Sequence, residues 1–412
     1  MSFSQALSGL NAQKQTLGAV GNNIANSQTV GFKSSSVQFA DVFAESRIGL
    51  GTRNSATLQD FGQGNIESTN RNMDLAIAGE GFFRFQQPSG EVGYSRNGQL
   101  TMTADGKLVN AQGASIMGYA ANAAGEVQAG GDVEALRVDA GDLAASATTG
   151  LDIELNLDSE EGELTAPAEA DILAGLDSGD YSYSTNATIY DSQGNARNLT
   201  MYFTKTDAAT NQWNVGLRMT GGPEGAGTYA AADATTLDFD ANGALEAGGA
   251  ATLNLTADEF DGDQLAELNV AIDFAGTTQF ANNSTVNDIN QDGYTSGSLV
   301  GVTIGNDGTI MRNYSNEQSL AAGQVALVSF RNPEGLKPDG DNLWSATGAS
   351  GQELVGAPGT GLRGLIEPSA VETSNVDMAA ELVDMIIAQR AYQANSQTIS
   401  TQDELLQTII NL

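Results

Sequence analysis

The sequence predicts a mainly β, multidomain fold with long N- and C-terminal α-helices that form a coiled-coil-like terminal domain. Three observations carry this prediction. Apolar residues recur every seven positions near both ends of the 412-residue chain, strand-and-turn patterns fill the interval between them, and acidic residues gather in one internal stretch. This length suggests two to four domains, each able to bury a core. Because both ends share one pattern, we expect nested domains built from discontinuous chain segments.

The N-terminal helix is predicted by a heptad stripe. Its apolar positions are Phe3, Leu7, Leu10, Leu17 and Ile24. Ser2 is suited to cap the helix, and Gln5 three residues later completes a capping box. A core helix of an ordinary globular domain would give a similar stripe. However, one narrow stripe cannot form a dry core alone, so this helix needs partners.

A second helix is predicted from about 376 to 410, with a length of ~50 Å. Its apolar stripe comprises Met378, Leu382, Met385, Ile386, Ala388, Tyr392, Ile399, Leu406 and Ile409, and it is diluted by Asn395 and Gln402. Ser374 or Asn375 is a plausible cap, and Asp377 and Glu381 suit the positive end of the helix dipole. The opposite end of the chain, or further copies of it, would supply the packing partners.

The interior reads as β-structure. Asn97-Gly98 between 92–96 and 99–103 predicts a hairpin with a type I′ turn. Asp105-Gly106 predicts a further turn, and 187–190 and 199–203 predict a hairpin around Asp191-Ser192-Gln193-Gly194. Trp213, Val215 and Leu217 alternate as on a strand with one buried face. Later turns are predicted at 306–308 and 332–335.

An acidic stretch interrupts this region. Residues 145–284 hold 23 of the 51 acidic residues but only three basic ones, Arg197, Lys205 and Arg218. Because both flanks resemble parts of one β-domain, we interpret this stretch as an insertion whose ends lie close together. A solvating surface is the default interpretation of its charge, with a metal-binding surface or a saline-habitat signature as alternatives.

The sequence predicts four parts, three of which combine two separate chain segments. They are a terminal helical domain of 1–30 and 372–412, extended linking segments of 31–71 and 358–371, a middle β-domain of 72–144 and 285–357, and the inserted acidic β-domain of 145–284.

Composition excludes several classes of function. The chain has no cysteine and no histidine, which excludes disulfides, thiolate metal sites and a Ser-His-Asp triad. A net charge of −34 argues against nucleic-acid or anionic-membrane partners. Residues 238–243 imitate a calcium loop, but the twelfth position is Gly249, so a β-turn is the better interpretation. Carboxylate pairs such as Glu160-Glu161 are too common here to indicate catalysis. We therefore predict no enzyme activity, no cofactor and no metal.

No targeting signal is recognised in the sequence. The first lysine is Lys14, so the N-terminus lacks the basic region of a cleaved secretory peptide. No apolar run approaches the ~18 residues that span a bilayer, so no membrane insertion is expected. The chain is therefore expected to be cytoplasmic or exported without a cleaved peptide.

The most specific motifs stand at the two ends. The N-terminal string contains Asn22, Asn23, Ile24, Ala25, Asn26, Gly31, Phe32 and Lys33. Taken alone, it is an Asn/Gly-rich helix stop. Together with 374–383, Gln389, Arg390 and the following 391–395, it resembles the bacterial flagellar rod and hook axial protein family. Residues 1–10, 94–98, 190–195 and 314–318 are most similar to the hook members of that family.

The resemblance implies a structural subunit. Hook members self-assemble into a curved, flexible tube that joins rod to filament and transmits torque, with terminal helices around a central channel. It implies a homopolymer that meets a distal rod protein, a hook cap, hook–filament junction proteins and the flagellar type III export apparatus. It also implies an extracellular location after export without a cleaved signal.

Two alternatives remain open from the sequence. Another axial subunit, from the distal rod or associated with the hook, would keep both termini; however, a rod subunit should lack the insertion, and a hook-associated one should not match 94–98 and 314–318. A secreted carboxylate-dependent glycosidase is conceivable from composition alone, but it leaves both heptad ends unexplained.

Overall fold

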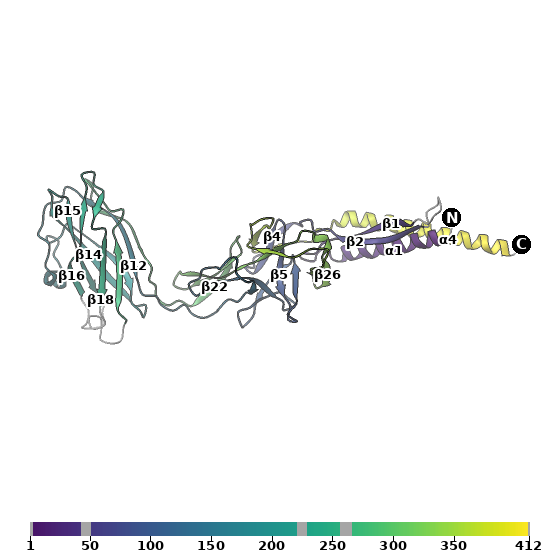
Figure 1. Cartoon of the computed structure of the whole chain (residues 1–412), viewed down its shortest axis with the longest axis horizontal. Coiled ribbons are helices and arrows are strands. Elements are labelled where there is room, and N and C mark those ends of the chain that lie inside the picture. The colour runs from purple at the N-terminus through teal and green to yellow at the C-terminus, as the bar shows by residue number, and fades with distance from the viewer. Residues whose placement is uncertain (1–2, 43–50, 221–228, 256–265, 411–412) are drawn as a thin grey trace. The chain divides into compact units, whose positions relative to one another are not determined.

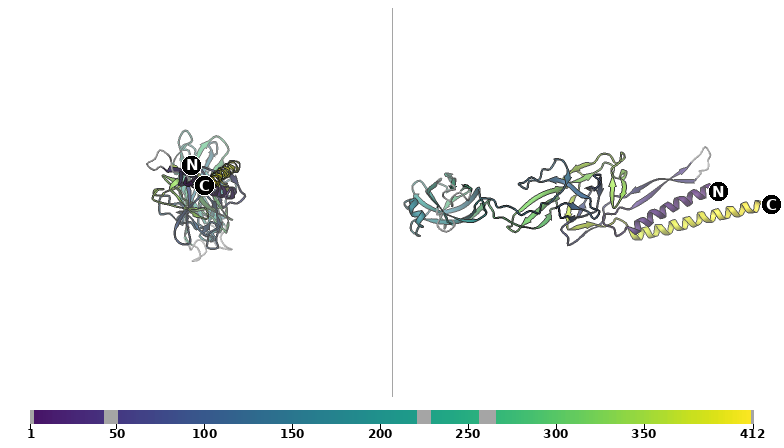
Figure 2. Two further views of the ribbon diagram at one scale, coloured as in Figure 1. Left: turned by 90° about the vertical axis from the view of Figure 1, so that its right-hand side faces the viewer. Right: turned by 90° about the horizontal axis from the view of Figure 1, so that it is seen from below.

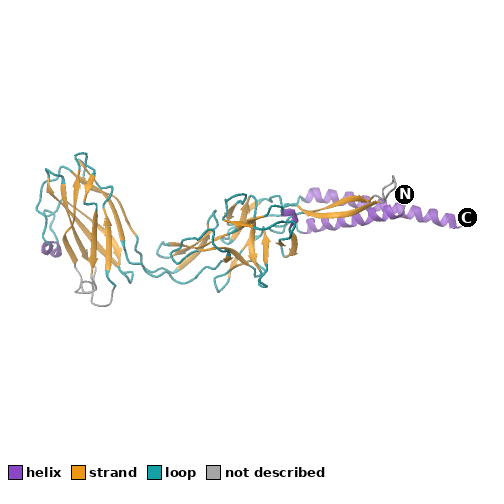
Figure 3. Ribbon diagram, viewed as in Figure 1, coloured by secondary structure: helices purple, strands orange, loops and turns teal. Residues whose placement is uncertain are grey.

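The computed structural model describes residues 3–42, 51–220, 229–255 and 266–410 and divides the chain into two compact units. The first unit comprises Met1–Ala140, Val300–Asn313 and Ser319–Leu412. The second comprises Gly141–Leu299 and Tyr314–Gln318. The first unit therefore contains both ends of the chain, as the nested arrangement requires. The chain is built mostly from strands, with a helix near each end (Figure 3). This confirms the predicted mainly β, multidomain class with terminal helices.

Two long helices stand at the ends of the first unit. They are α1, Phe3–Ala25, and α4, Met378–Ile410. Figures 1 and 2 show them side by side and antiparallel, with the start of α1 toward the end of α4. A hairpin of β1, Ser35–Val42, and β2, Gly51–Gln59, also packs on α1. Since α4 has 33 residues and α1 has 23, the last turns of α4 extend beyond α1.

The cap of α4 differs from the expected one. The Asp377 carboxylate accepts hydrogen bonds from the backbone N–H groups of Ala379, at 2.8 Å, and Ala380, at 3.2 Å. Asp377 is thus the N-cap, because its side chain satisfies donors of the first turn. Asn375 instead ties the two ends of the chain together through the Ser34 N–H and the Asp60 carbonyl. Ser2 lies outside the described residues.

The rest of the first unit is β-structure around one main core. Its largest sheet is built from β5 Phe82–Gln86, β6 Val92–Ser95, β8 Thr101–Met102, β9 Leu108–Val109, β10 Ser115–Ala120, β11 Glu134–Ala135, β22 Leu299–Ile304, β23 Thr309–Tyr314, β24 Ser319–Val325, β25 Leu327–Ser329, β26 Lys337–Gly340, β27 Leu343–Ser345 and β28 Leu354–Gly356. Its main path runs β22-β23-β24-β10-β5-β6-β27-β26. A short 3₁₀ helix, Pro333–Gly335, marks the turn predicted at 332–335.

Two smaller sheets join segments far apart in the sequence. They comprise β3 Ile66–Ser68 with β30 Ala370–Glu372, and β4 Asp74–Ala78 between β29 Leu365–Pro368 and β7 Gly98–Gln99. The core between the sheets contains the side chains of Leu75, Ile77, Phe83, Phe85, Ile116, Val325 and Ile366. The chain segments before and after the insertion therefore share one core.

The hairpin predicted at Asn97-Gly98 is wrong. β6 pairs with β5 and β27, whereas β7 pairs with β4, so the two flanking segments separate. A Cβ on Gly98 would clash with the Leu75 carbonyl oxygen and would lie 2.6 Å from the Phe83 ring. Glycine is needed here for close packing, not for a type I′ turn. The turn at Gly106, with φ +79°, does connect β8 to β9 as predicted.

The second unit is a β-sandwich. One sheet contains β12 Gly150–Asp158, β18 Ala250–Leu255, β19 Leu268–Asp273, β20 Thr278–Phe280 and β21 Thr285–Gln291; the other contains β13 Tyr183–Tyr190, β14 Ala196–Asp207, β15 Gln212–Thr220, β16 Tyr229–Phe239 and β17 Leu245–Ala247. Alternate residues of both sheets fill one core, among them Leu151, Ile153 and Leu155 on β12 and Trp213, Val215 and Leu217 on β15. This confirms the predicted strand at 213–217. A short helix, α2 Glu169–Ala174, packs on β16.

The bounds of the second unit differ from the expected insertion of 145–284. The unit continues to Leu299 because β21 pairs with β12 over residues 285–291. Leu143 and Gly297 exchange backbone hydrogen bonds of 2.8 and 3.0 Å, so the entering and leaving strands are neighbours. The turn at 240–243 is closed by the Asp240 carboxylate, which accepts the N–H groups of Asn242 and Ala244 at 2.8 Å.

A buried carboxylate closes the predicted turn at 191–194. Asp191 lies between β13 and β14 and accepts hydrogen bonds from the Arg197 guanidinium at 2.8 Å and from the N–H of Asn195 at 2.9 Å. Burial alone would raise the pKa of Asp191, but the hydrogen bonds from Asn195 and Arg197 hold that pKa below its usual value. A carboxyl with a lowered pKa stabilises the folded state above its unfolded pKa and loses this contribution as pH falls through the folded one.

We expect Asp191→Asn to destabilise the second unit by about 3 kcal/mol at neutral pH, because the buried Arg197 guanidinium loses the carboxylate that balances its charge. The difference from the wild type should begin to shrink below about pH 3.9, the usual pKa of an unfolded Asp, and should disappear as pH falls through the lowered pKa of folded Asp191. Thermal melting of the full chain between pH 2 and 7 measures both effects, with Asp152→Asn, an exposed acid on β12, as the control. A constant difference across this range would contradict the assignment.

Candidate assembly surface

The terminal helices carry more exposed large apolar side chains than the rest of the described chain. Ten of the eighteen exposed large apolar side chains among the described residues belong to α1 and α4. They are Phe3, Leu7, Met378, Leu382, Val383, Ile386, Ile387, Tyr392, Leu405 and Leu406. Exposed apolar side chains gathered on one element indicate a binding surface, whereas scattered ones do not. We call these ten residues the exposed helical surface.

A different stripe of α4 faces α1. Ala388 is buried, and Glu381, Asn395 and Gln402 are half-buried. These four residues recur every seven positions and form what we call the polar seam. At one end, Asn23 of α1 donates a 2.8 Å hydrogen bond to the Glu381 carboxylate. Further along, the Asn395 amide lies directly against Gly9.

The predicted apolar stripe of α4 is therefore split by the fold. Met385 and Ile399 are half-buried beside the polar seam, whereas Met378, Leu382, Tyr392 and Leu406 are exposed. Gln389 and Arg390 are exposed as well, and the side chain of Ile409 lies outside the described residues. The role of these residues in assembly stays a prediction. Their exposure shows that the first unit leaves most of the stripe unused.

The stripe of α1 is divided in the same way. Phe3 and Leu7 are exposed, and Leu10, Leu17 and Ile24 are half-buried. The buried apolar side chains of α1 are instead Ala6, Ala12 and Val20. The hairpin covers part of the helix: Ser8 Oγ accepts the Thr52 N–H at 3.2 Å. Small side chains thus permit close packing on both sides of α1.

The Asn/Gly string is more than a helix stop. Asn23, 2% exposed, accepts the Ser35 N–H at 2.9 Å through Oδ1 and donates from Nδ2 to Glu381. It thereby joins the end of α1 to the start of both β1 and α4. Asn26 donates back to the Asn22 carbonyl at 3.0 Å and closes the end of the helix. Asn22 and Ala25 are exposed, and Phe32 is half-buried.

Gly31 and Lys33 lie where the helical segments meet the β-structure. Gly31 has φ +70°, and a Cβ there would lie 2.6 Å from the Asn97 nitrogen, so only glycine fits. Lys33 is fully buried and donates to the Glu372 carboxylate and the Gly62 carbonyl, each at 2.6 Å. Arg96 approaches the same carboxylate at 3.5 Å. We call Lys33, Arg96 and Glu372 the buried ionic junction.

Burial dominates the electrostatics of this junction. It lowers the pKa of Lys33, and the attraction of Glu372, which favours the charged form, offsets this only in part. Burial likewise lowers the pKa of Arg96. Among the described side chains, Arg96 Nε and Glu372 Oε2 have no hydrogen-bond partner. We expect this buried ion pair to fix which segments meet more than to add stability.

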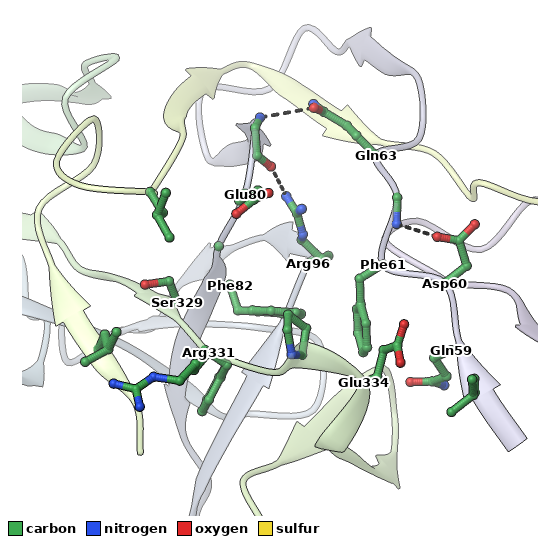
Figure 4. Close-up of a pocket in the computed structure, with 18 of the residues that line it drawn as sticks. Gln59, Asp60, Phe61, Gln63, Glu80, Phe82, Arg96, Ser329, Arg331 and Glu334 are labelled. Carbon is green, nitrogen blue, oxygen red and sulfur yellow. Dashed lines mark hydrogen bonds between the residues drawn. The ribbon is translucent and has the colours of Figure 1, made fainter. Parts of the chain in front are cut away.

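An open groove of about 930 Å³ lies beside the junction (Figure 4). Arg96 donates to the Gly79 carbonyl at 2.9 Å on its wall, and Gln63 accepts the Gly79 N–H at 3.1 Å. Phe61 meets Phe82 edge-to-face with ring centroids 5.3 Å apart. These contacts attach residues 61–63, which precede β3, to the β-structure of the first unit.

The sequence did not predict which residues contact Lys33 or which face of α4 meets α1. Glu372 was assigned only to a domain range, yet it joins Lys33 across 339 positions. A buried lysine needs a carboxylate, but nothing in a single sequence tells which of 51 acids supplies it. The polar seam had a signal: Asn395 and Gln402 interrupt the apolar stripe seven residues apart. The apolar residues beside them were the more obvious pattern.

Four family matches together cover most of the chain. Residues 4–33 match "Flagella basal body rod protein", and 367–412 match "Flagellar basal body rod FlgEFG protein C-terminal". Residues 76–155 match "Flagellar hook protein FlgE/F/G D1 domain", and 156–294 match "Flagellar basal body protein FlaE D2 domain". The two terminal matches coincide with α1 and α4 and with the Asn/Gly string.

Full-length relatives carry the same name. The chain is 43% identical to the flagellar hook protein FlgE of Salmonella typhimurium and 42% identical to that of Escherichia coli, each over all of both chains. It is 34% identical to the FlgE of Brucella suis, covering 98% of this chain and 97% of the relative. The crystal structure of Helicobacter pylori flagellar hook protein FlgE2 aligns with 74% of this chain and all of that one, at a TM-score of 0.55 and 15% identity, which supports the fold. The chain therefore belongs to the FlgE family of bacterial flagellar hook proteins.

Proposed function

We propose that this chain polymerises through α1 and α4 into the curved, flexible tube of the bacterial flagellar hook, which connects the rod to the filament and transmits torque. The observation that carries the proposal is the exposed helical surface. α4 contacts α1 through the polar seam, while Leu382, Ile386 and Leu406 are left open in the isolated chain. Burying a large apolar side chain contributes about 1.5–3 kcal/mol, so repeated contacts between copies would hold a polymer together.

The mechanism is mechanical. In a curved tube that rotates, each row of subunits shortens on the inside and lengthens on the outside once per turn. Contacts between the β-units must therefore have several arrangements of similar energy, which wet contacts between small polar residues permit. A composition with 49 glycines and 6% aromatic residues suits this demand. The helices would supply continuity.

Further partners follow from this role. We propose that the polymer meets a distal rod protein at one end, a hook cap during growth and hook–filament junction proteins at the other end. We also propose delivery by the flagellar type III export apparatus without a cleaved signal. None of the helices in the described ranges has the length and apolar character that a membrane crossing requires. Full-length identity to hook proteins favours this role over another axial subunit or a glycosidase.

Limited trypsin digestion tests the proposal, because each helix contains one basic residue, Lys14 in α1 and Arg390 in α4, and both are exposed. In dilute monomer we expect rapid cleavage at both. The helix pair buries mainly Ala6, Ala12, Val20 and Ala388, which is too little to offset the ~1–2 kcal/mol per residue that ordering costs. In the polymer both bonds should be protected.

Lys107, exposed on the β-structure of the first unit, is the internal reference, and its cleavage rate should change least on polymerisation. Equal protection of Lys14 and Arg390 in dilute monomer and in polymer would contradict the proposed role of the helices.

A further inference from the structure

The antiparallel helix pair is fixed at two points with matching intervals. Asn23 bonds Glu381 at 2.8 Å, and Gly9 contacts Asn395. Both pairs are separated by two heptads on each helix, so both contacts form together only in one register. A shift of α4 along α1 would break both at once. The buried Asn23 amide would then lose a charge-assisted hydrogen bond, which is costly in a water-excluded site.

The contact at Gly9 brings a side chain of α4 against the backbone of α1. A Cβ on Gly9 would lie 2.9 Å from Asn395 Nδ2, 3.0 Å from Oδ1 and 3.1 Å from Cγ, so the amide rests on the bare backbone of α1. The amide is also fixed within α4, because Nδ2 donates to the Ala391 carbonyl at 3.0 Å. α1 has two other glycines, Gly18 and Gly21, and a Cβ on either would meet nothing within 4 Å. Of the three glycines in α1, only Gly9 therefore lies against a side chain of α4.

A competing seam exists on the same helix. Met385, Tyr392, Ile399 and Leu406 also recur every seven residues; Met385 and Ile399 are half-buried beside the polar seam, whereas Tyr392 and Leu406 are exposed. A seam centred on this apolar heptad would bury more apolar surface against α1 than the polar seam does. Burial alone would thus rotate or slide α4 so that this stripe faced α1. A polar residue at one seam position is known to select register and partner in coiled coils at a cost in stability.

We propose that Gly9 and Asn395 act as a register pin. They select the polar seam for contact within the chain and so leave Tyr392 and Leu406 exposed for contact with other copies of the chain. This inference rests on the proposed polymerisation through the helices. It assigns Asn395, which interrupts the predicted apolar stripe, a positioning role: it decides which face of α4 the neighbours meet.

The first test compares Gly9→Ala with Gly18→Ala in the full chain. Both changes raise helix propensity equally, but only the first places a methyl group against Asn395. We expect Gly9→Ala to raise the critical concentration for polymerisation about tenfold or more, as overpacking does. Gly18→Ala should polymerise at the wild-type concentration or below it. Equal behaviour of the two variants would overturn the proposal.

The second test asks whether Asn395 is the residue that Gly9 accommodates. Gly9→Ala should have no further effect on polymerisation in the Asn395→Ala background, because truncating the amide opens the space that the new methyl group needs. An equal rise in critical concentration from Gly9→Ala with and without Asn395 would contradict the pin. This readout separates a specific contact from a general loss of helix packing.

The third test measures register directly. The chain has no cysteine, so spin labels can be attached to cysteines placed at exposed Gln15 and Ser400. In tubes diluted with unlabelled chain, the otherwise wild-type protein should give one distance. Asn395→Ala should add a second population shifted by about 10 Å, one heptad of helix rise. A single unshifted distance in Asn395→Ala would overturn the proposal. Failure of the unlabelled wild type to polymerise would instead count against the proposed function.

Discussion

Leu406→Asp should abolish polymerisation while leaving both units folded. Leu406 is 52% exposed in the single chain, so the change costs the monomer little, but in a packed helical layer it buries a carboxylate with no partner. Such a charge costs about 3 kcal/mol or more, which corresponds to at least a hundredfold rise in critical concentration. Light scattering follows polymerisation, and thermal melting of the monomer should match the wild type.

Ile399→Asp should also block polymerisation, but through two effects. Ile399 is half-buried beside the polar seam, so its replacement also disturbs the contact with α1. Met102→Asp is the matched control, because Met102 is 41% exposed on β8, away from the helices. Polymerisation by Leu406→Asp at the wild-type concentration would mean that this position faces solvent or the channel in the tube.

Removing the inserted unit should straighten the tubes without preventing their formation. Leu143 and Gly297 already form a doubly hydrogen-bonded antiparallel pair, so an Asn-Gly dipeptide can replace 144–296 as a two-residue type I′ turn. The helices and the shared core of the first unit remain. In a tube whose outer layer is the inserted unit, contacts between these units lie at the largest radius and therefore affect curvature most.

The same deletion should remove most of the response to salt. The 145–284 stretch carries a net charge of −20, from 23 acidic and three basic residues. Neighbouring units should repel over a Debye length of ~10 Å at 0.1 M salt and approach as salt is added. Wild-type tubes should therefore change curvature with ionic strength, as seen by electron microscopy, and truncated tubes much less. Truncated tubes with wild-type curvature and salt response would place the bending element in the first unit.

The sequence predicted long, periodic elements well because their signal is local. The C-terminal helix was expected from about 376 to 410 and spans Met378–Ile410. The hairpin around Asp191 was found because its turn residues and its alternating strands agree. Local signals failed where a distant segment decides the structure, as at Gly98, whose missing side chain serves Leu75 and Phe83.

The surface was harder to predict than the fold. A heptad stripe shows that a helix needs partners, but not which partner takes which face. Met385 and Leu406 belong to one stripe in the sequence, yet the first is half-buried beside the polar seam and the second is open. Only the packing of α1 on Glu381, Ala388 and Asn395 separates the contacts made within the chain from those left for other copies.

Electron microscopy of the purified full-length chain, before and after a jump in salt or precipitant concentration, tests the central claim most directly. The account predicts short, curved, hollow tubes of uniform diameter after the jump and dispersed monomers before it. Persistent monomers, or only amorphous aggregates, under conditions in which both units remain folded would contradict it.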